Sequence, residues 1–399
     1  MNWSARWQQA VAETEQAGLY RQRRVLTSAQ CVHQEIDGQQ ILSFSSNDYL
    51  GLAADARLAE AGARASQRYG TGAGASHLVN GHHRLHHELE LALADFLGRE
   101  AVLLFSSGYM ANLGTLQALG PMVQRIYHDR LNHASLLDGS RLAGLPTRRY
   151  PHGNMATLQN WLMQHGETVM LVTDGVFSMD GDAAPLQELI ALARTHNSLL
   201  VVDDAHGIGV LGEGGRGVTA PFNSAQVPVL IGTLSKAFGS YGAFVAGDSS
   251  LIDYLLQFAR TYRYTTALPP AIAASALAAL DIVQQEPERR VHLQRLISCL
   301  RAGLMSLGQP LLGAADSPIQ PVVIGAAEQA IQVAEQLWQQ GILVVPIRPP
   351  TVPKGSARLR ITLTAQHSLA DVDRLLNALR PLLEPKETGV GKTLESQHG

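Results

Sequence analysis

The chain has 399 residues, of which 46% are hydrophobic and 16% are charged, and its formal net charge is −3. This composition provides enough apolar side chain for a sizeable core, and it excludes nucleic acid as the main partner because phosphate binding requires a basic face. Cys31 and Cys299 lie far apart without a CxxC pair, and we find no signal-peptide pattern and no apolar run of about 20 residues. We therefore expect a soluble, cytoplasmic protein without a disulfide framework and without a membrane span.

In chain order, the sequence predicts an arm, two domains and a tail. Residues 1–45 indicate an N-terminal arm with one helix and a short strand pair. Over 46–285, short runs rich in Val, Leu and Ile alternate with helical stretches, which predicts a large α/β domain with a mostly parallel sheet covered on both faces. Residues 286–385 indicate a small C-terminal α/β domain, and the polar segment 386–399 is expected to be a flexible tail.

Two glycine-rich stretches resemble nucleotide loops only superficially. GIGVLG at 207–212 matches GxGxxG, but EGGRGVTAPF follows where a dinucleotide fold needs a helix, so we interpret the stretch as a loop. RYGTGAGASH at 68–77 lacks the GK[ST] ending of a phosphate loop. Its glycines favour a tight path of the chain near a ligand or a partner.

A histidine-rich stretch, GHHRLHHELE at 81–90, has the spacing of a metal site. It places His82 four residues before His86, and His83 four residues before His87, as in helical zinc sites. The alternative is the polar first turn of an ordinary helix, and the sequence offers no obvious third ligand. We therefore predict no metal.

The position of Lys236 is the clearest chemical signal in the sequence. It follows the apolar run VPVLIG, and it is the only lysine in the first 353 residues, although Lys and Arg together number 31. A primary amine can form a Schiff base or act as a base once burial lowers its pKa, whereas a guanidinium does neither usefully. Ligands of parallel sheets bind at the carboxyl ends of strands, which is where this amine is expected. The sequence therefore predicts a nucleophilic lysine.

If this amine holds pyridoxal phosphate, three further parts are needed, and the sequence offers a candidate for each at another strand end. A carboxylate that keeps the pyridine nitrogen protonated is available in VVDDAHG, as Asp203 or Asp204. Backbone N–H groups for the phosphate are available where FSSGYMANLGTL opens a helix at Gly108. A flat group for the ring face is available as His133 in HDRLNHAS.

Five segments together resemble the α-oxoamine synthases, which are pyridoxal phosphate enzymes with the aspartate aminotransferase type of fold (fold type I). The segments are SNDYLGL, SSGYMAN, DDAHGIGVLG, TLSKAFG and PPTVPKGSARLRITLTAQH. The resemblance covers about residues 20–385. It implies a homodimer that shares its active sites.

The resemblance assigns a role to each matching position. It implies that Lys236 carries the cofactor as a Schiff base and that Asp203, not Asp204, binds the ring nitrogen. It implies that His206 donates to the phenolic oxygen of the ring, that His133 stacks on the ring and that Ser178 lies beside it. The implied phosphate contacts are Gly108, Tyr109, Thr233, Ser235 and, across the dimer interface, Thr265. The implied substrate contacts are Arg360 for the amino-acid carboxylate, together with His133, Arg21, Arg348 and Thr351.

Two of the segments indicate the substrates. GAGASHLVNGHHRLHHELE and IRPPTVPKGSARLRITLT are most similar to the family member of biotin biosynthesis, which condenses L-alanine with a pimeloyl thioester of coenzyme A or acyl carrier protein. The alternatives are members that use glycine or serine, such as 2-amino-3-ketobutyrate CoA ligase. An aminotransferase and a non-catalytic binding protein with the same fold are more distant alternatives.

Overall fold

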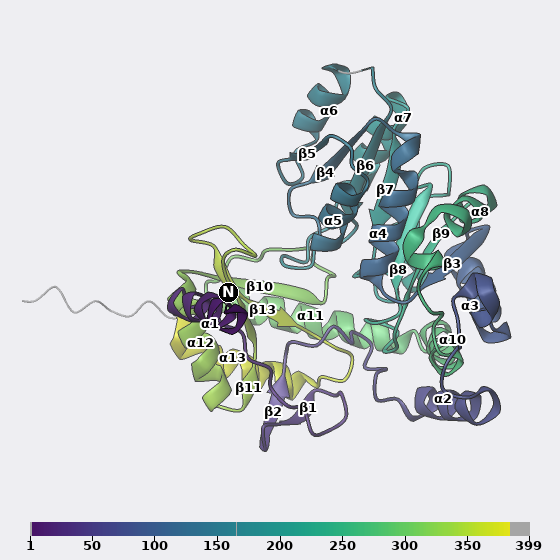
Figure 1. The fold of residues 1–399 in the computed structure, drawn as a ribbon. Coiled ribbons are helices and arrows are strands. Elements are labelled where there is room, and N and C mark those ends of the chain that lie inside the picture. Colours follow the sequence, from purple (N-terminus) through teal and green to yellow (C-terminus); the bar gives the residue numbers. More distant parts are fainter. Residues whose placement is uncertain (1, 165, 384–399) are drawn as a thin grey trace, which may run out of the picture.

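A computed structural model describes residues 2–164 and 166–383 of the chain (Figure 1). The tail expected over 386–399 lies outside the described residues. Three sheets organise the described chain, and Figure 1 shows the largest sheet separated from the two smaller ones, with helix α11 running between the two regions. The boundaries proposed at residues 45, 285 and 385 remain a prediction.

The largest sheet has seven strands, and all of its pairings are parallel except those of β9, which runs antiparallel to β3 and β8. The predicted, mostly parallel sheet is therefore confirmed. Every residue of β6, β8 and β9 is buried, which explains why these strands are continuous apolar runs. In spatial order the strands are β3 (Ala101–Phe105), β9 (Ala243–Gly247), β8 (Val229–Thr233), β7 (Leu199–Asp203), β6 (Val169–Asp174), β4 (Arg125–Asp129) and β5 (Thr147–Tyr150).

Helices cover both faces of this sheet and bury its apolar side chains. One face packs against α4 (Gly108–Leu119), α5 (Ala134–Leu142), α8 (Ser249–Phe258) and α9 (Arg260–Arg263). The opposite face packs against α6 (Met155–Gln164), α7 (Leu186–Thr195), α3 (Arg84–Leu97) and α10 (Pro270–Gln285), and α2 (Ala56–Tyr69) packs on α10. Because both faces of the sheet are buried under helices, polar functional side chains are expected at the ends of the strands.

The second region is built on an antiparallel sheet in the order β10 (Ile319–Gly325), β13 (Ala357–Thr362) and β12 (Val345–Ile347). Its helices are α11 (Glu288–Ser306), α12 (Ala327–Gln339) and α13 (Leu369–Leu383). The run ILVVPIR is divided between two sheets. Ile342–Leu343 (β11) pairs with β2 (Gln39–Ser43), whereas Val345–Ile347 (β12) pairs with β13.

The N-terminal arm contains the predicted helix and strand pair, as α1 (Trp3–Gln16), β1 (His33–Ile36) and β2 (Gln39–Ser43). Asp37 and Gly38 join the strands with φ of 49° and 77°, the conformation of a two-residue hairpin loop. The short helical segments are η1 (His77–Gly81), η2 (Gly120–Met122) and η3 (Glu213–Gly215). Within the described ranges, we find no helix that is both long enough and apolar enough to cross a membrane.

Candidate active site

Three strands of the large sheet end side by side in polar residues. Asp174 ends β6 and Asp203 ends β7, and the two are register partners in the parallel ladder. Thr233 ends the next strand, β8, and Lys236 follows it by three residues. The carboxyl edge of the sheet therefore gathers two carboxylates and one amine, as expected from the strand order.

The surroundings of Lys236 favour its neutral amine. The pKa of Lys236 is lowered to about 8, mainly by burial and to a smaller extent by the Arg360 cation, while Asp203 and Asp174 act in the opposite direction. The loop that carries the lysine is held in place at Gly239, where φ is +57° and a Cβ would lie 2.3 Å from the backbone nitrogen of Ala53. Glycine at this position lets the TLSKAFG loop pack directly on the SNDYLGL segment.

The two consecutive aspartates of VVDDAHG have different environments. Asp203 is 6% exposed, its Oδ2 accepts from Asn112 Nδ2 at 2.6 Å, and its Oδ1 accepts from the backbone N–H of Ala205 at 3.0 Å. Asp204 is fully buried and accepts from the backbone N–H of Val218 at 2.8 Å, and burial raises its pKa to about 8. The raised pKa favours the protonated, neutral form of Asp204, and its hydrogen bond holds a loop in place. This geometry favours Asp203, and not Asp204, as the partner of a ring nitrogen.

The loop pinned by Asp204 contains the GIGVLG stretch. It leads into η3, a single turn of 3-10 helix, and not into the helix that a dinucleotide site requires. A Cβ on Gly207 would lie 2.1 Å from Asp204 Oδ1, so the first glycine of the pattern serves the packing of this carboxyl. The interpretation of 207–212 as a loop is confirmed.

A chain of hydrogen bonds joins Asp203 to His133. The Asn112 amide donates one hydrogen to Asp203 and the other to Ser135 Oγ at 2.8 Å, and Ser135 Oγ lies 2.7 Å from His133 Nδ1. The backbone N–H of Ser135 also donates to His133 Nδ1 at 3.3 Å, so Nδ1 is an acceptor and the His133 ring proton lies on Nε2. His133 is the N-cap of α5, and loss of hydration lowers its pKa although the residue keeps an exposed surface.

A buried carboxylate lies behind His133. Asp174 Oδ2 accepts from the His133 backbone N–H at 2.7 Å. Burial, and next the neighbouring Asp203 carboxylate, raise the pKa of Asp174 well above its usual range. Asp174 therefore anchors the start of α5.

His206 is buried against a tyrosine of the SNDYLGL segment. Its Nδ1 lies 2.6 Å from the Tyr49 hydroxyl, which is also 3.3 Å from Asn47 Oδ1. Burial lowers the pKa of His206 well below its usual range and raises the pKa of Tyr49 to about 12. At neutral pH the pair therefore consists of a neutral imidazole and a neutral phenol, and the direction of this bond decides which ring nitrogen of His206 carries the proton.

The start of α4 faces the end of β8. Gly108 is the first residue of the helix, and a Cβ built on it would lie 4.0 Å from Thr233 Oγ1. Thr233 Oγ1 lies 2.8 Å from Ser235 Oγ, so two hydroxyls lie next to the positive end of a helix. Tyr109 bonds to Asp138, and its ring centroid lies 6.5 Å from that of His133. The four predicted phosphate contacts of a single chain are therefore brought together.

Thr265 has a different position. It is half-buried beside the bridge between Ser76 and Thr266, and no contact joins it to the other phosphate candidates within the described chain. Its role was expected across a dimer interface, so it stays a prediction about the partner subunit.

Arg360 connects the second sheet with the site. It lies on β13, is 9% exposed, and donates from Nε to the carbonyl of Ser178 at 2.6 Å. Its Nη1 donates to Thr362 Oγ1 at 3.0 Å and its Nη2 to Asn47 Oδ1 at 3.1 Å. These bonds use three of the five guanidinium hydrogens, and the guanidinium also bonds to the Tyr49 hydroxyl, so at least one hydrogen remains for a carboxylate.

The remaining substrate candidates line a separate hollow between the arm and the second region. Arg21, Arg348 and Thr351 belong to the lining of a cavity of about 1120 Å³. Arg348 donates to the carbonyl of Gly18, and the Thr351 N–H donates to the Arg348 carbonyl at 3.0 Å. The structure thus brings these three together, but Lys236 is not among the residues that line this cavity.

Sequence reasoning missed the residues that orient the site. Asn112, Ser135, Asp174, Asn47 and Tyr49 each bond to a predicted site residue. Asn112, Asn47, Tyr49 and Ser135 lie inside the stretches quoted above, but the sequence assigned them no role. Asp174 had no signal beyond its place at the end of a strand.

Comparisons with known proteins agree with this architecture. The model of the aminotransferase class I and II family matches residues 39–379. An 8-amino-7-oxononanoate synthase of Marinobacter nauticus is 52% identical over 371 residues, which cover 92% of this chain and 94% of that protein.

Solved structures agree as well. A serine palmitoyltransferase variant from S. paucimobilis, described with bound PLP and myriocin, has a TM-score of 0.89 at 29% identity and covers 96% of this chain and 98% of its own. The 8-amino-7-oxononanoate synthase of Francisella tularensis has a TM-score of 0.75 at 31% identity, with coverage of 86% and 97%. The aspartate aminotransferase type of fold is thereby confirmed. The chain belongs to the aminotransferase class I and II family and, within it, to the 8-amino-7-oxononanoate synthases.

Proposed function

We propose that the protein catalyses the decarboxylative condensation of L-alanine with a pimeloyl thioester, which yields 8-amino-7-oxononanoate, CO2 and a free thiol. The observation that carries the proposal is the convergence of Lys236, Asp203 and Arg360. The three groups interact electrostatically at one sheet edge: a buried amine with a lowered pKa, a hydrogen-bonded carboxylate and a guanidinium that keeps a donor for substrate.

The residues at this edge fit pyridoxal 5'-phosphate by the chemistry of their donors and acceptors. The start of α4 with the Thr233 and Ser235 hydroxyls fits a phosphate, and Asp203 fits a protonated ring nitrogen. His206 fits the phenolic oxygen, with His133 and Ser178 beside the ring. When bound, pyridoxal phosphate supplies an electron sink that stabilises a carbanion at the α-carbon of an amino acid.

In our proposal, Arg360 binds the carboxylate of alanine through its charge and its remaining N–H donor. A charge-assisted hydrogen bond of this kind contributes orientation as well as affinity, so it helps to set which bond of the α-carbon faces the amine of Lys236. The Ser178 carbonyl, Thr362 and Asn47 hold the guanidinium in place for this task.

Lys236 then acts as the base that removes the α-proton. Its pKa of about 8 lies near neutrality, where an amine accepts and returns a proton most effectively. The resulting carbanion attacks the thioester carbonyl and expels the thiol. The β-keto acid so formed loses CO2, because its carboxyl group leaves an electron pair next to a ketone, and Lys236 returns the proton to the α-carbon.

The cavity lined by Arg21, Arg348 and Thr351 suits the acyl partner, since the far end of a pimeloyl chain is a carboxylate and arginines bind carboxylates. We infer that this partner is pimeloyl-CoA or pimeloyl-acyl carrier protein. We also propose a homodimer, in which Thr265 of one chain completes the phosphate contacts of the other. The cytoplasmic location expected from the sequence stays a prediction.

The proposal is tested with the purified protein, resupplied with pyridoxal phosphate, in a panel of L-alanine, glycine and L-serine crossed with pimeloyl-CoA, acetyl-CoA and palmitoyl-CoA. We expect stoichiometric release of thiol and CO2 only for L-alanine with the pimeloyl thioester. Turnover with glycine and acetyl-CoA instead would keep the family and overturn the substrates. Amino-group transfer to an α-keto acid without CO2 release would indicate an aminotransferase.

A further inference from the structure

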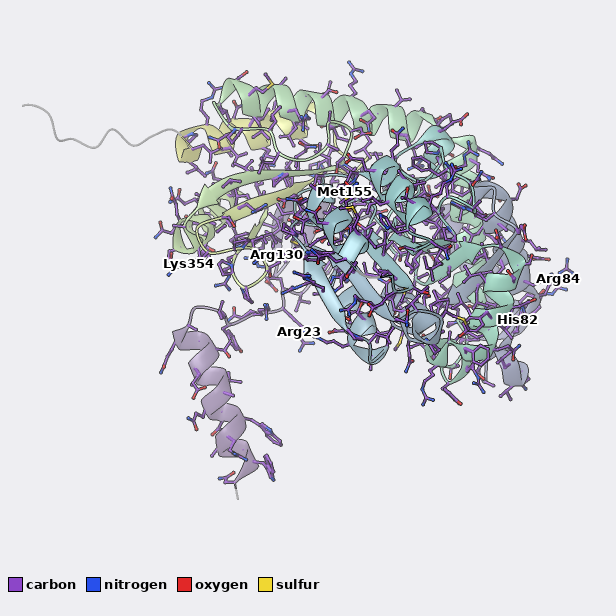
Figure 2. All side chains as sticks on the ribbon, turned by 90° about the horizontal axis from the view of Figure 1, so that it is seen from above. Arg23, His82, Arg84, Arg130, Met155 and Lys354 are labelled. Atoms are coloured by element: carbon purple, nitrogen blue, oxygen red, sulfur yellow. The ribbon has the colours of Figure 1, made fainter. Side chains whose placement is uncertain are left out.

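The histidine-rich stretch at the start of α3 lies apart from the site described above. Figure 2 shows His82 at the opposite end of the molecule from Arg23 and Lys354, which lie on the side of the arm and the second region. The sequence offered no third ligand at this spacing, but folding supplies candidates. His77, from η1, and Glu90, from the second turn of α3, both come close to His82.

Two groups of three possible ligands share His82, and the hydrogen bonds of their members show which group is available for a metal. In the triad of His77, His82 and His86, the Nδ1 of His86 accepts from the His83 N–H at 2.9 Å, and its Nε2 bonds to the Leu268 carbonyl at 2.7 Å. Both ring nitrogens of His86 are therefore occupied by backbone groups that it would have to abandon. His86 is a structural residue that ties α3 to the chain after α9.

The second triad has ligand atoms available. His82, His87 and Glu90 each offer one ligand atom, and these atoms lie within 4.8 Å of one another. His87 and Glu90 are one turn apart on the same helix, and His82 precedes the helix and folds beside them. The His82 Nε2 and Glu90 Oε2 atoms are 3.9 Å apart, whereas two ligands of a tetrahedral zinc ion are about 3.3 Å apart for bonds of about 2.0 Å. A small side-chain adjustment closes this difference.

The groups behind these ligands have the arrangement of an outer shell. His82 Nδ1 lies 3.0 Å from His77 Nδ1, and His77 is buried and stacked on the ring of Tyr262. Glu90 Oε1 accepts from the backbone N–H of Leu104 at 3.1 Å, which leaves Oε2 directed at His82. Metal ligands usually have their second nitrogen or oxygen bonded in this way, which fixes the tautomer and the orientation of the ligand.

The charges also favour a cation. When His82 donates from Nδ1 to His77, its Nε2 lone pair faces the Glu90 carboxylate, and only a proton or a cation can lie between them.

We propose that His82, His87 and Glu90 form a binding site for a divalent transition-metal ion of the Zn²⁺ class. Two imidazoles and one carboxylate are a set of three protein ligands that zinc accepts, with water at the fourth position. His82 and His87 are exposed, so the ion can enter without unfolding. The ion links the segment before α3 to the second turn of that helix.

The test uses the full, untagged chain with pyridoxal phosphate bound, stripped with a chelator and dialysed. Zinc binding is measured by titration calorimetry, and Co²⁺ is added separately because its visible absorption reports tetrahedral coordination. We expect one Zn²⁺ per chain, an intense tetrahedral Co²⁺ spectrum and a rise in the melting temperature on adding Zn²⁺.

The His87→Ala variant is the decisive one, because an exposed side chain can be removed without a cavity. It is expected to weaken zinc binding at least about 10-fold and to abolish the Co²⁺ spectrum. Glu90→Gln is expected to do the same, and His196→Ala, a histidine at the end of α7, serves as the control that retains binding. Equal zinc affinity in His87→Ala and the unmodified protein, or no binding to the unmodified protein, would show a hydrogen-bonded histidine cluster only and overturn the proposal.

Discussion

The sheet-edge site and the cavity at the N-terminal arm are built in opposite ways. At the sheet edge, Asp203, Asp174 and His206 are buried, and each is held by a hydrogen bond from a different element. At the cavity, Arg21 and Thr351 are exposed and lie in loops. A cofactor reaction needs fixed distances and tuned pKa values, which burial provides, whereas a long, flexible acyl chain can be recognised by accessible cations at its end.

Among substitutions in the two regions, the largest loss of turnover is expected at Lys236. Lys236→Ala should reduce thiol and CO2 release by about 10³-fold or more, because no other group can supply both the Schiff base and the base. Lys236→Arg should fail equally, although it keeps the charge, because a guanidinium does not give up its proton. Near-normal turnover by either variant would contradict the assignment.

Arg360 is expected to give the next largest effect. Arg360→Ala should raise the KM for L-alanine about 10- to 100-fold, because a charge-assisted bond contributes about 1.5–3 kcal/mol. The KM for the thioester serves as the internal control and should change little. An unchanged KM for alanine together with a higher KM for the thioester would show that Arg360 binds the thioester and not alanine.

The pKa of Lys236 can be tested without turnover. The neutral amine is the reactive form, and a pKa lowered to about 8 makes the neutral fraction rise about 10-fold between pH 7 and pH 9 and then level off. The rate at which the cofactor-free protein takes up pyridoxal phosphate should follow this curve, with Lys236→Ala as the blank. An amine of ordinary pKa would instead show a rise of about 100-fold over the same interval and no plateau.

Tyr49 tests whether the buried network controls chemistry or only stability. We expect the Tyr49 hydroxyl to donate to His206 Nδ1 and so to keep the His206 proton on Nε2 for the phenolic oxygen of the cofactor. Tyr49→Phe should change the ratio of the cofactor's absorption bands and lower kcat about 5-fold, since a neutral hydrogen bond contributes about 1 kcal/mol. The control is Tyr127→Phe, which removes a buried hydroxyl that has no partner in the described chain. An unchanged spectrum in Tyr49→Phe would show that the bond only stabilises the fold.

The smallest effects are expected at the cavity. Arg348→Ala and Arg21→Ala should each raise the KM for the pimeloyl thioester a few-fold, because exposed ion pairs contribute about 0–1 kcal/mol. The KM for alanine should not change, and Arg64→Ala on α2 is the matched control of an exposed arginine. An effect as large as that of Arg360→Ala would contradict the expectation that the exposed cavity contributes less to substrate binding than the buried sheet edge.

The sequence alone determined the chemistry of the sheet edge. Strands that are buried on both faces must be continuous apolar runs, so their ends, and the polar residues that follow them, can be read directly. An isolated lysine after such a run, with DDAH and SSGYMAN after two others, predicted the cofactor, and the resemblance of five segments predicted the family and the roles of the site residues. The histidine spacing at 82–87 was equally visible, but the sequence did not show a third ligand beside it.

Only the tertiary structure decided how these groups are oriented. The bonds of Asn47 and Tyr49 to Arg360 and His206 join residues more than 150 positions apart, and no local pattern encodes such a contact. The same holds for the division of ILVVPIR between two sheets, since backbone pairing depends on which strand edge lies nearby. The position of Glu90 was also decided by the tertiary structure. Helix α3 packs against the edge strand β3, where the backbone N–H of Leu104 donates to the Glu90 carboxylate and so directs it towards His82.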